Sequence, residues 1–378
     1  MASTYSLLID GTPADDTLVN AISELEVEEN ADLPGAISLK VPVSATADGD
    51  LTYVADDRLR PFANLAVVAT PEGGEAQCIF DGFVLSHKLH LQTGTTASTL
   101  EVWGQDASWL MNLEEKAHEW VDVTDADVAN AVFGDYGITP ADDNTQDDSP
   151  SHTESGHSLM QRATDIQFLR ALARRNGKLC RVACAGQAGQ RIGYFAKPKL
   201  DGDAVLTITL NDPQAWTVNA LDIEWDATRP TSVVARQALF TDDDPQGVSA
   251  DTSDSGLAPL DQRGLADFSG HPITAMLTAP VDDGGELSLR AQSLLREAGN
   301  FVRCEGEADV ARLGAVMRVG TVVQIDGIGS LHSGKYYVWS VRHTISADSH
   351  KMKFVLVRNA VGPPPSSGGS GLPGGVGL

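Results

Sequence analysis

The sequence lacks long apolar segments. It contains no run of eighteen or more apolar residues, so a membrane-spanning helix is not expected. The first residues, Met1–Ser6, have neither the basic start nor the apolar stretch of a signal peptide. We therefore expect synthesis in a cytoplasm without export by the general route.

Cysteine is scarce, with four residues in a chain of 378. That number is too small for a disulfide framework, and the spacing of Cys180 and Cys184 fits neither a C-x-x-C pair nor a usual zinc site. Free cysteine behaves as a small apolar residue. We therefore interpret the four thiols as buried and reduced.

Basic residues are also scarce: 27 Lys and Arg stand against 52 Asp and Glu, which gives a formal net charge of −25. Nucleic-acid binding draws its affinity from clustered Lys and Arg, so nucleic acid and anionic membranes are excluded as expected partners. The excess of acidic residues is explained equally well by a requirement for solubility or by an acidic inner surface, or lumen, that has a function.

Motifs for catalysis or for cofactor binding are missing. The chain has no G-x-S-x-G elbow, no H-E-x-x-H and no phosphate-binding loop, and Gly327–His332 is better interpreted as a hairpin turn. His87 and His90 are expected on opposite faces of a strand. The acidic run Asp242–Asp244 lacks the order of a calcium loop. We therefore expect no catalytic residue, no cofactor and no metal.

Short β-type runs separated by turn residues dominate both ends of the chain. In the first third they are Tyr5–Ile9, Leu25–Glu29, Ala36–Val43, Leu65–Ala69, Ala76–Lys88 and Ser98–Gly104. Later runs are Ala204–Leu210, Leu221–Trp225, Ser232–Leu239, Val316–Val323, Tyr336–His343 and Met352–Val357. Closely spaced strands without long helices predict a β-rich α+β fold in which the antiparallel strands form a barrel or a sandwich.

Helical patterns interrupt the β-type runs at three places. Thr124 is the expected N-cap of a short helix that continues through Phe133, and Thr164 begins a clearer helix that stops at Gly177. A polar loop is expected over Asp142–Ser151. The third helix is expected over Glu286–Glu297, with Leu289, Leu294 and Leu295 forming its apolar face.

These patterns divide the chain into five parts. They are a first β-barrel (1–113), an α+β module (114–198), a second β-barrel (199–240 and 305–360), an inserted module with a helix (241–304) and a flexible Gly/Pro/Ser tail (361–378).

Two segments carry a resemblance to a known family. Phe301–Glu307, Gly320–Gly327 and Gly334–His343 resemble the C-terminal half of the phage late control D family, and Asp165–Gly177 is similar to its other recurring segment. That family includes the baseplate hub of contractile tails and resembles the hub part of VgrG spike proteins. The resemblance implies tube-protein-like barrels and a non-enzymatic role.

The resemblance also implies partners. Three copies would form a ring of six similar barrels that joins a sixfold tail tube to a threefold central spike. The expected partners are two further copies, a separate spike protein, a tail tube protein, and baseplate wedge or LysM-type proteins. The expected location is an assembled tail, a virion or an extracellular injection particle. A cell-wall hydrolase attached to a tail and a simple tube protein are the alternatives.

Five aromatic residues are candidate packing or interface positions: Trp103, Trp109, Trp120, Tyr336 and Trp339. Buried aromatic side chains are favoured both in domain cores and in subunit interfaces. The sequence leaves core or interdomain packing and a subunit interface both open for these positions.

Overall fold

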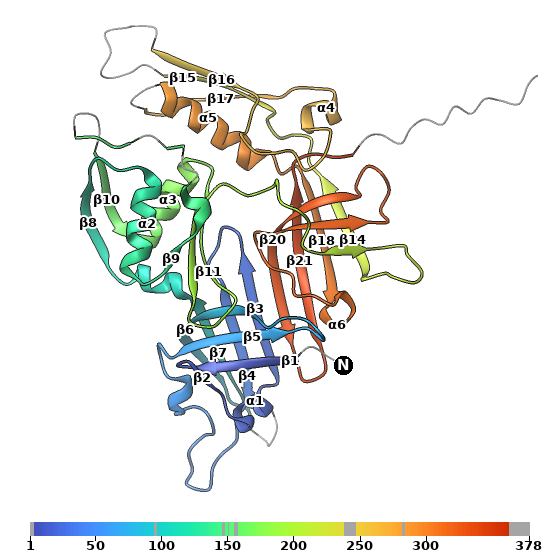
Figure 1. Cartoon of the computed structure of the whole chain (residues 1–378). Coiled ribbons are helices and arrows are strands. Elements are labelled where there is room, and N and C mark those ends of the chain that lie inside the picture. The colour runs from blue at the N-terminus through green and yellow to red at the C-terminus, as the bar shows by residue number, and fades with distance from the viewer. Residues whose placement is uncertain are drawn as a thin grey trace, which may run out of the picture.

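The computed structural model describes residues 4–93, 97–145, 148–149, 151–154, 158–237, 247–281 and 284–362. Figure 1 shows a large β structure, blue at its N-terminal end and orange-red at its C-terminal end, with two smaller modules on one side of it. Within the described part of the chain, no helix is both long and apolar enough to cross a membrane.

The largest sheet has thirteen strands and is almost entirely antiparallel. Its main path runs through β14 (Val218–Trp225), β18 (Val302–Asp309), β21 (His350–Arg358), β20 (Gly334–Ile345), β3 (Glu24–Asn30), β4 (Ala36–Pro42), β7 (Thr99–Asp106), β6 (Gln77–His90), β5 (Asn64–Thr70), β1 (Thr4–Ile9) and β2 (Thr12–Pro13). β19 (Val322–Asp326) pairs with β20, and β13 (Thr207–Thr209) pairs in parallel with β19.

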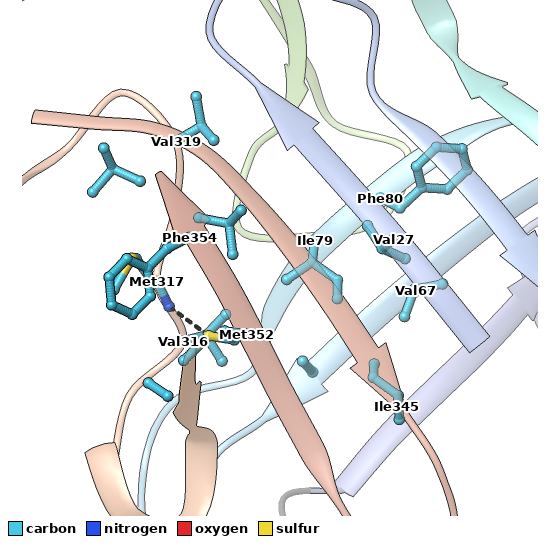
Figure 2. Packing of buried hydrophobic residues seen from close by; sticks show 14 of the residues in the cluster. Val27, Val67, Ile79, Phe80, Val316, Met317, Val319, Ile345, Met352 and Phe354 are labelled. Carbon is cyan, nitrogen blue, oxygen red and sulfur yellow. Dashed lines mark hydrogen bonds between the residues drawn. The ribbon is translucent and has the colours of Figure 1, made fainter. Parts of the chain in front are cut away.

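The two β blocks of the sequence are joined by the pairing of β20 with β3. This antiparallel pairing extends from Ser340 opposite Asn30 to Ile345 opposite Leu25. One apolar core continues across the junction, and Figure 2 shows Val27 and Val67 of the first block near Ile345 of the second. The predicted class, β-rich α+β with large antiparallel sheets, is confirmed.

Two predicted boundaries of the second β block differ in the structure. The predicted strand Val316–Val323 begins only at Val322, because a turn with Gly320 at φ +87° interrupts it. Val361, assigned to the tail, is buried and pairs with Arg263. The rest of the predicted tail, 363–378, lies outside the described residues.

An α+β module follows the first block and has its own apolar core. The predicted N-cap Thr124 is confirmed, with a capping box to Asp127. Thr164 also precedes its helix, but its side chain accepts no hydrogen bond from the helix backbone, and its hydroxyl donates to Asn112 Oδ1. The elements are η2 (Ala107–Asn112), β8 (Glu115–Trp120), α2 (Asp125–Asp135), β9 (Thr139–Pro140), η3 (Asp142–Thr145), β10 (Leu159–Thr164), α3 (Asp165–Arg175), β11 (Leu179–Cys184) and β12 (Arg191–Ala196).

The predicted loop Asp142–Ser151 is partly wrong. Its first residues form η3, and Asn144 is buried there. The Asn144 side chain donates to the Gly193 carbonyl and accepts from the Phe195 amide at 2.7 Å. A polar residue is buried at this position because the backbone of β12 satisfies its hydrogen bonds.

The second module contains β15 (Ser232–Gln237), β16 (Val248–Thr252), β17 (Thr274–Leu277) and α5 (Gly284–Ala298). β15 was assigned to the second barrel, but it pairs with β16 and β17 in a separate sheet. The predicted inserted module, 241–304, therefore contains the strands β16 and β17 as well as the expected helix. α5 buries Leu287, Ala291 and Leu295, and Leu294 packs partly buried against the same core. The predicted apolar face is therefore confirmed for Leu294 and Leu295, whereas Leu289 lies outside this core and Leu287 takes its place. The remaining elements are α1 (Asp16–Ala21), η1 (Asp57–Leu59), α4 (Leu265–Ser269) and α6 (Val310–Leu313).

Candidate functional site: a charged face of the sheet

One face of the large sheet carries charged side chains along several neighbouring strands. In β3, Leu25 and Val27 are buried in the core, whereas Glu24, Glu26 and Glu28 alternate with them. Side chains alternate between the two faces of a strand, so these carboxylates lie on the face away from the core.

The same alternation continues into β20 and β21. Val341 and His343 are buried, whereas Arg342 is exposed, and Lys351 and Lys353 of β21 are exposed as well. We call the resulting surface the charged face. Its charged members are Glu24, Glu26, Glu28, Lys40, Lys88, Glu101, Asp222, Glu305, Glu307, Arg342, Lys351 and Lys353.

Strand register places opposite charges beside each other on the charged face. Glu307, Lys353, Arg342 and Glu28 are successive cross-strand neighbours, so a pair of opposite charges lies on each side of the like-charged neighbours Lys353 and Arg342. Arg342 Nη2 lies 2.9 Å from Glu28 Oε2, so this ion pair joins β20 to β3. Cross-strand pairs of opposite charge each contribute about 0.2–1 kcal/mol, so this face is compatible with exposure to water.

A second row of the charged face crosses the first block. Glu24, Lys40, Glu101 and Lys88 are neighbours in register on β3, β4, β7 and β6. Lys88 Nζ lies 3.8 Å from Glu101 Oε2. Acidic side chains outnumber basic ones on the charged face, which matches the sign of the chain's net charge.

The charged face is hollowed where the two blocks meet. An open hollow of about 530 Å³ is lined by Glu28, Asp222, Glu305, Glu307, Arg342 and Lys353 among others. Four of these six charged groups are carboxylates, and three of the four belong to the second block. The geometry suits contact with water or a polar partner, and it offers no enclosed pocket for a small apolar ligand.

A buried ionic cluster supports the first module. Asp125 accepts from Arg175 Nη2 at 3.0 Å, lies 2.7 Å from His152 Nε2, and also bonds Asn176. Burial by itself raises the pKa of the Asp125 carboxyl, but the His152 hydrogen bond and the Arg175 charge outweigh it and lower the pKa. This carboxylate is therefore structural and ionised at neutral pH.

Arg296 of α5 joins the two modules. Its side chain is 2% exposed and donates to the Asn176 carbonyl at 2.7 Å and to the Ser255 carbonyl at 2.6 Å. Burial lowers the pKa of the Arg296 guanidinium, and the Asp148 charge partly opposes that shift. The second module is thus held beside the C-terminal end of α3.

The five aromatic positions lie in different surroundings. Trp103 is 39% exposed on β7, next to Ser38 and Ser86 of the neighbouring strands, on the charged face. Trp109 lies in η2 and Trp120 at the end of β8. No ring contact joins these three described residues.

The remaining aromatic contacts are local. Trp120 Nε1 donates to Gln161 Oε1 at 3.1 Å, and the buried Tyr336 donates to the His332 carbonyl at 2.8 Å. Trp339 lies at an irregularity of β20 and lines a hollow of about 310 Å³ that also involves Arg174 of α3. A role in a subunit interface stays a prediction for all five positions.

The Gly327–His332 segment connects β19 to β20, which are antiparallel neighbours, so the predicted hairpin is confirmed. Within the described ranges, no group of three or more His, Cys, Asp or Glu residues is arranged to hold a metal ion. The acidic run Asp242–Asp244 lies outside the described residues.

The charged face was not among the features predicted from the sequence. The alternation in Glu24–Glu28 was a usable signal, because it predicts one buried and one charged side of a strand. The pairing of β20 with β3 had no comparable signal, because the two strands are about three hundred positions apart.

The fold resembles solved tail proteins. A 43 kDa tail protein of prophage MuSo2 from Shewanella oneidensis has a TM-score of 0.66 and 14% identity, covering 95% of this chain and 100% of that one. A tail protein from Neisseria meningitidis MC58 has a TM-score of 0.65 and 13% identity, covering 95% and 97%. No curated protein matches.

A third solved structure belongs to a secretion machine. The E. coli c3393 protein, described as a component of the type VI secretion system with similarity to T4 tail proteins gp27 and gp5, has a TM-score of 0.56. Its identity is 11%, and the match covers 95% of this chain and 79% of that one. The expected likeness to tail and secretion proteins is thus confirmed for the fold, whereas the late control D family itself stays a prediction.

One family model covers most of the chain. The model described as "Alg8 N-terminal domain" matches residues 2–347, so the chain belongs to this family and has the fold of phage tail proteins.

Proposed function

We propose that this chain is the structural hub of a contractile phage tail or of a phage-derived injection system. In this proposal three copies surround one axis and connect a sixfold tail tube to a threefold spike. The observation that carries the proposal is the continuous sheet, in which β20 and β3 unite two β blocks in one copy. Two blocks in each of three copies supply six similar positions.

The charged face is the proposed lining of the central channel. It spans both blocks, its charges are paired across strands, and a hollow of about 530 Å³ lies at the junction of the blocks. A channel wall must stay hydrated and must not adhere to what passes through. A face of mixed charge with an acidic excess meets both requirements and repels acidic cargo.

The two modules are the proposed outer contacts. They lie on one side of the sheet in Figure 1, and Arg296 fixes them to each other. We propose that they contact baseplate wedge or LysM-type proteins through surfaces that leave Met276 of β17 in solvent, while the rims of the sheet contact the tube and the spike. The domain limits drawn from the sequence serve as working limits for this assignment, with β15 moved into the second module.

Cysteine labelling of assembled particles tests the channel assignment. Lys353→Cys places a thiol on the charged face, and Met276→Cys provides a matched control on β17, where Met276 is 79% exposed. We expect a small maleimide to label Lys353→Cys in free chain and in particles. A maleimide carrying a long polymer should label it only in free chain, whereas Met276→Cys should react with both reagents. Equal polymer labelling of Lys353→Cys in both states would refute the channel lining.

The alternative of a tail-associated cell-wall hydrolase has its own test. Glycoside cleavage needs two carboxyl groups placed across a substrate cleft. The carboxylates of the charged face are instead arranged beside Lys and Arg in an open hollow. Purified chain should therefore release no dye from labelled cell walls. Release that disappears when one carboxylate is replaced would establish the hydrolase.

A further inference from the structure

Two cysteines that are distant in sequence meet between the first β block and the first module. Cys78 lies on β6 and Cys184 at the end of β11, and their Sγ atoms are 2.9 Å apart. All four cysteines are free thiols in this structure. A contact of this length between two sulfurs requires little movement to form a bond.

The two thiols differ in access to solvent. Cys78 is fully buried, whereas Cys184 is partly exposed. A hollow of about 30 Å³, which is large enough to hold a water molecule, adjoins Cys184 and is also lined by Arg318 and Glu29. A reagent of the size of water or hydrogen peroxide fits there, so Cys184 is the residue that meets an oxidant first.

We propose that Cys78 and Cys184 form a redox site that closes to an intrachain disulfide on exposure to a small peroxide. The Cys184 thiolate attacks a peroxide oxygen, which forms an S–O bond, breaks the O–O bond and releases hydroxide. Cys78 sulfur then attacks Cys184 sulfur, which forms the S–S bond and releases the second oxygen. The two thiol protons convert the two released oxygens to two waters, and peroxide accepts the two electrons.

Charge and burial set the rate of the first step. The hydrogen bond from Cys78 and then burial raise the pKa of the Cys184 thiol well above its usual value, while the Arg318 charge partly offsets them. Arg318 is held in place by Glu29, with Nε 2.7 Å from Oε1. Only the thiolate attacks peroxide, so closure should be slow at neutral pH and faster at alkaline pH.

The other two cysteines provide internal controls. Burial raises the pKa of Cys180 and of Cys304 to about 12. Neither is bonded to another sulfur among the described residues. Cys180 lies on the same strand as Cys184. Its reaction with peroxide therefore tests whether oxidation depends on position in that strand or on the contact with Cys78.

The disulfide would attach β6 to β11 and would close a loop of 106 positions. Closing a long loop restricts the unfolded chain and stabilises the folded one. Formation of the disulfide requires only this chain and peroxide, but the role given to it in a particle rests on the proposed function. A particle assembled with reduced thiols would be locked after it leaves the reducing cytoplasm.

Treatment of the full native chain with hydrogen peroxide at pH 8.5, followed by alkylation in denaturant and mass spectrometry, tests the proposal. We expect two of the four thiols to resist alkylation, a mass decrease of about 2 Da before alkylation, and a cross-linked peptide pair that contains Cys78 and Cys184. Reductant should restore all four thiols. Four reactive thiols after prolonged treatment, or a disulfide that involves Cys180, would overturn the proposal.

Variants separate the two steps. Cys78→Ser should leave a sulfenic acid at Cys184 that dimedone captures, whereas Cys184→Ser should form neither that sulfenic acid nor the disulfide. Cys304→Ser should close the disulfide at the parental rate. If Cys78→Ser does not fold, Cys78→Ala with the same dimedone readout replaces it. If the isolated chain forms the disulfide but does not assemble into particles, the redox site is supported and the hub assignment is contradicted. Failure of the redox proposal can therefore be distinguished from failure of the proposed function.

Discussion

The contact between the two modules depends on Arg296, and the substitution Arg296→Met tests it. The guanidinium reaches four acceptors: the carbonyls of Ser255 and Asn176, and the side chains of Gln292 and Asp148. Methionine keeps much of the volume but donates no hydrogen bond. The variant therefore removes the contacts and leaves a hydrophobic side chain in the same place.

The expected cost follows from those contacts. A hydrogen bond from a charged donor contributes about 1.5–3 kcal/mol net, and removal of one partner from a buried ionic site costs about 3–5 kcal/mol. Because Arg296 is 2% exposed and Asp148 is 28% exposed, water can rescue Asp148 but not the Asn176 carbonyl. We expect Arg296→Met to lower the free energy of unfolding by about 3–5 kcal/mol.

Denaturant unfolding combined with hydrogen exchange measures this loss. Arg342→Met is the matched control, because Arg342 makes one ion pair with Glu28 at 51% side-chain exposure. The control should cost no more than about 1 kcal/mol. Amide protection should fall in α5 and around Asn176 in Arg296→Met only. Equal stability of the two variants, with protection of α5 unchanged, would refute the reasoning.

Three further predictions concern backbone and protonation. Gly177→Ala should lower stability by about 1–3 kcal/mol in thermal unfolding, because Gly177 has φ +60° and a new Cβ would lie 2.9 Å from the α5 backbone. Gly327→Ala should cost at least as much and weaken exchange protection of β13, because its Cβ would lie 1.8 Å from the Leu210 carbonyl oxygen. Burial lowers the pKa of His350 to about 4 and that of His343 well below 6.5. The unfolded chain therefore binds protons that the folded chain does not, so stability should fall between about pH 6.5 and 4, by on the order of 3 kcal/mol for His350 alone. Urea titrations at stepped pH should show a smaller decrease for His343→Gln combined with His350→Gln.

Local features of the fold could be predicted from the sequence because their causes are local. Thr124 caps its helix with the side chain that the pattern indicated, and Gly177 ends α3 with the positive φ that glycine tolerates. Strands with alternating residues, such as β3, were found within two residues of their ends.

Features that depend on distant contacts could not be predicted. The face of α5 that is buried depends on the sheet β15–β16–β17, so Leu287 and not Leu289 enters the core. Asn144 looked like a loop residue, because its partners Gly193 and Phe195 are about fifty positions away. The contact of Cys78 with Cys184 likewise arises only when two separately predicted parts pack together.

The number of copies in the assembled ring tests the hub assignment most directly. Each chain carries a net charge of −25, so three chains carry three times 25, or −75, and salt should favour assembly by screening repulsion. Native mass spectrometry at moderate ionic strength with the spike partner added should report three copies of this 40.0 kDa chain per complex. A monomer or dimer at every ionic strength, or six copies in the hub layer of a particle reconstruction, would contradict the account.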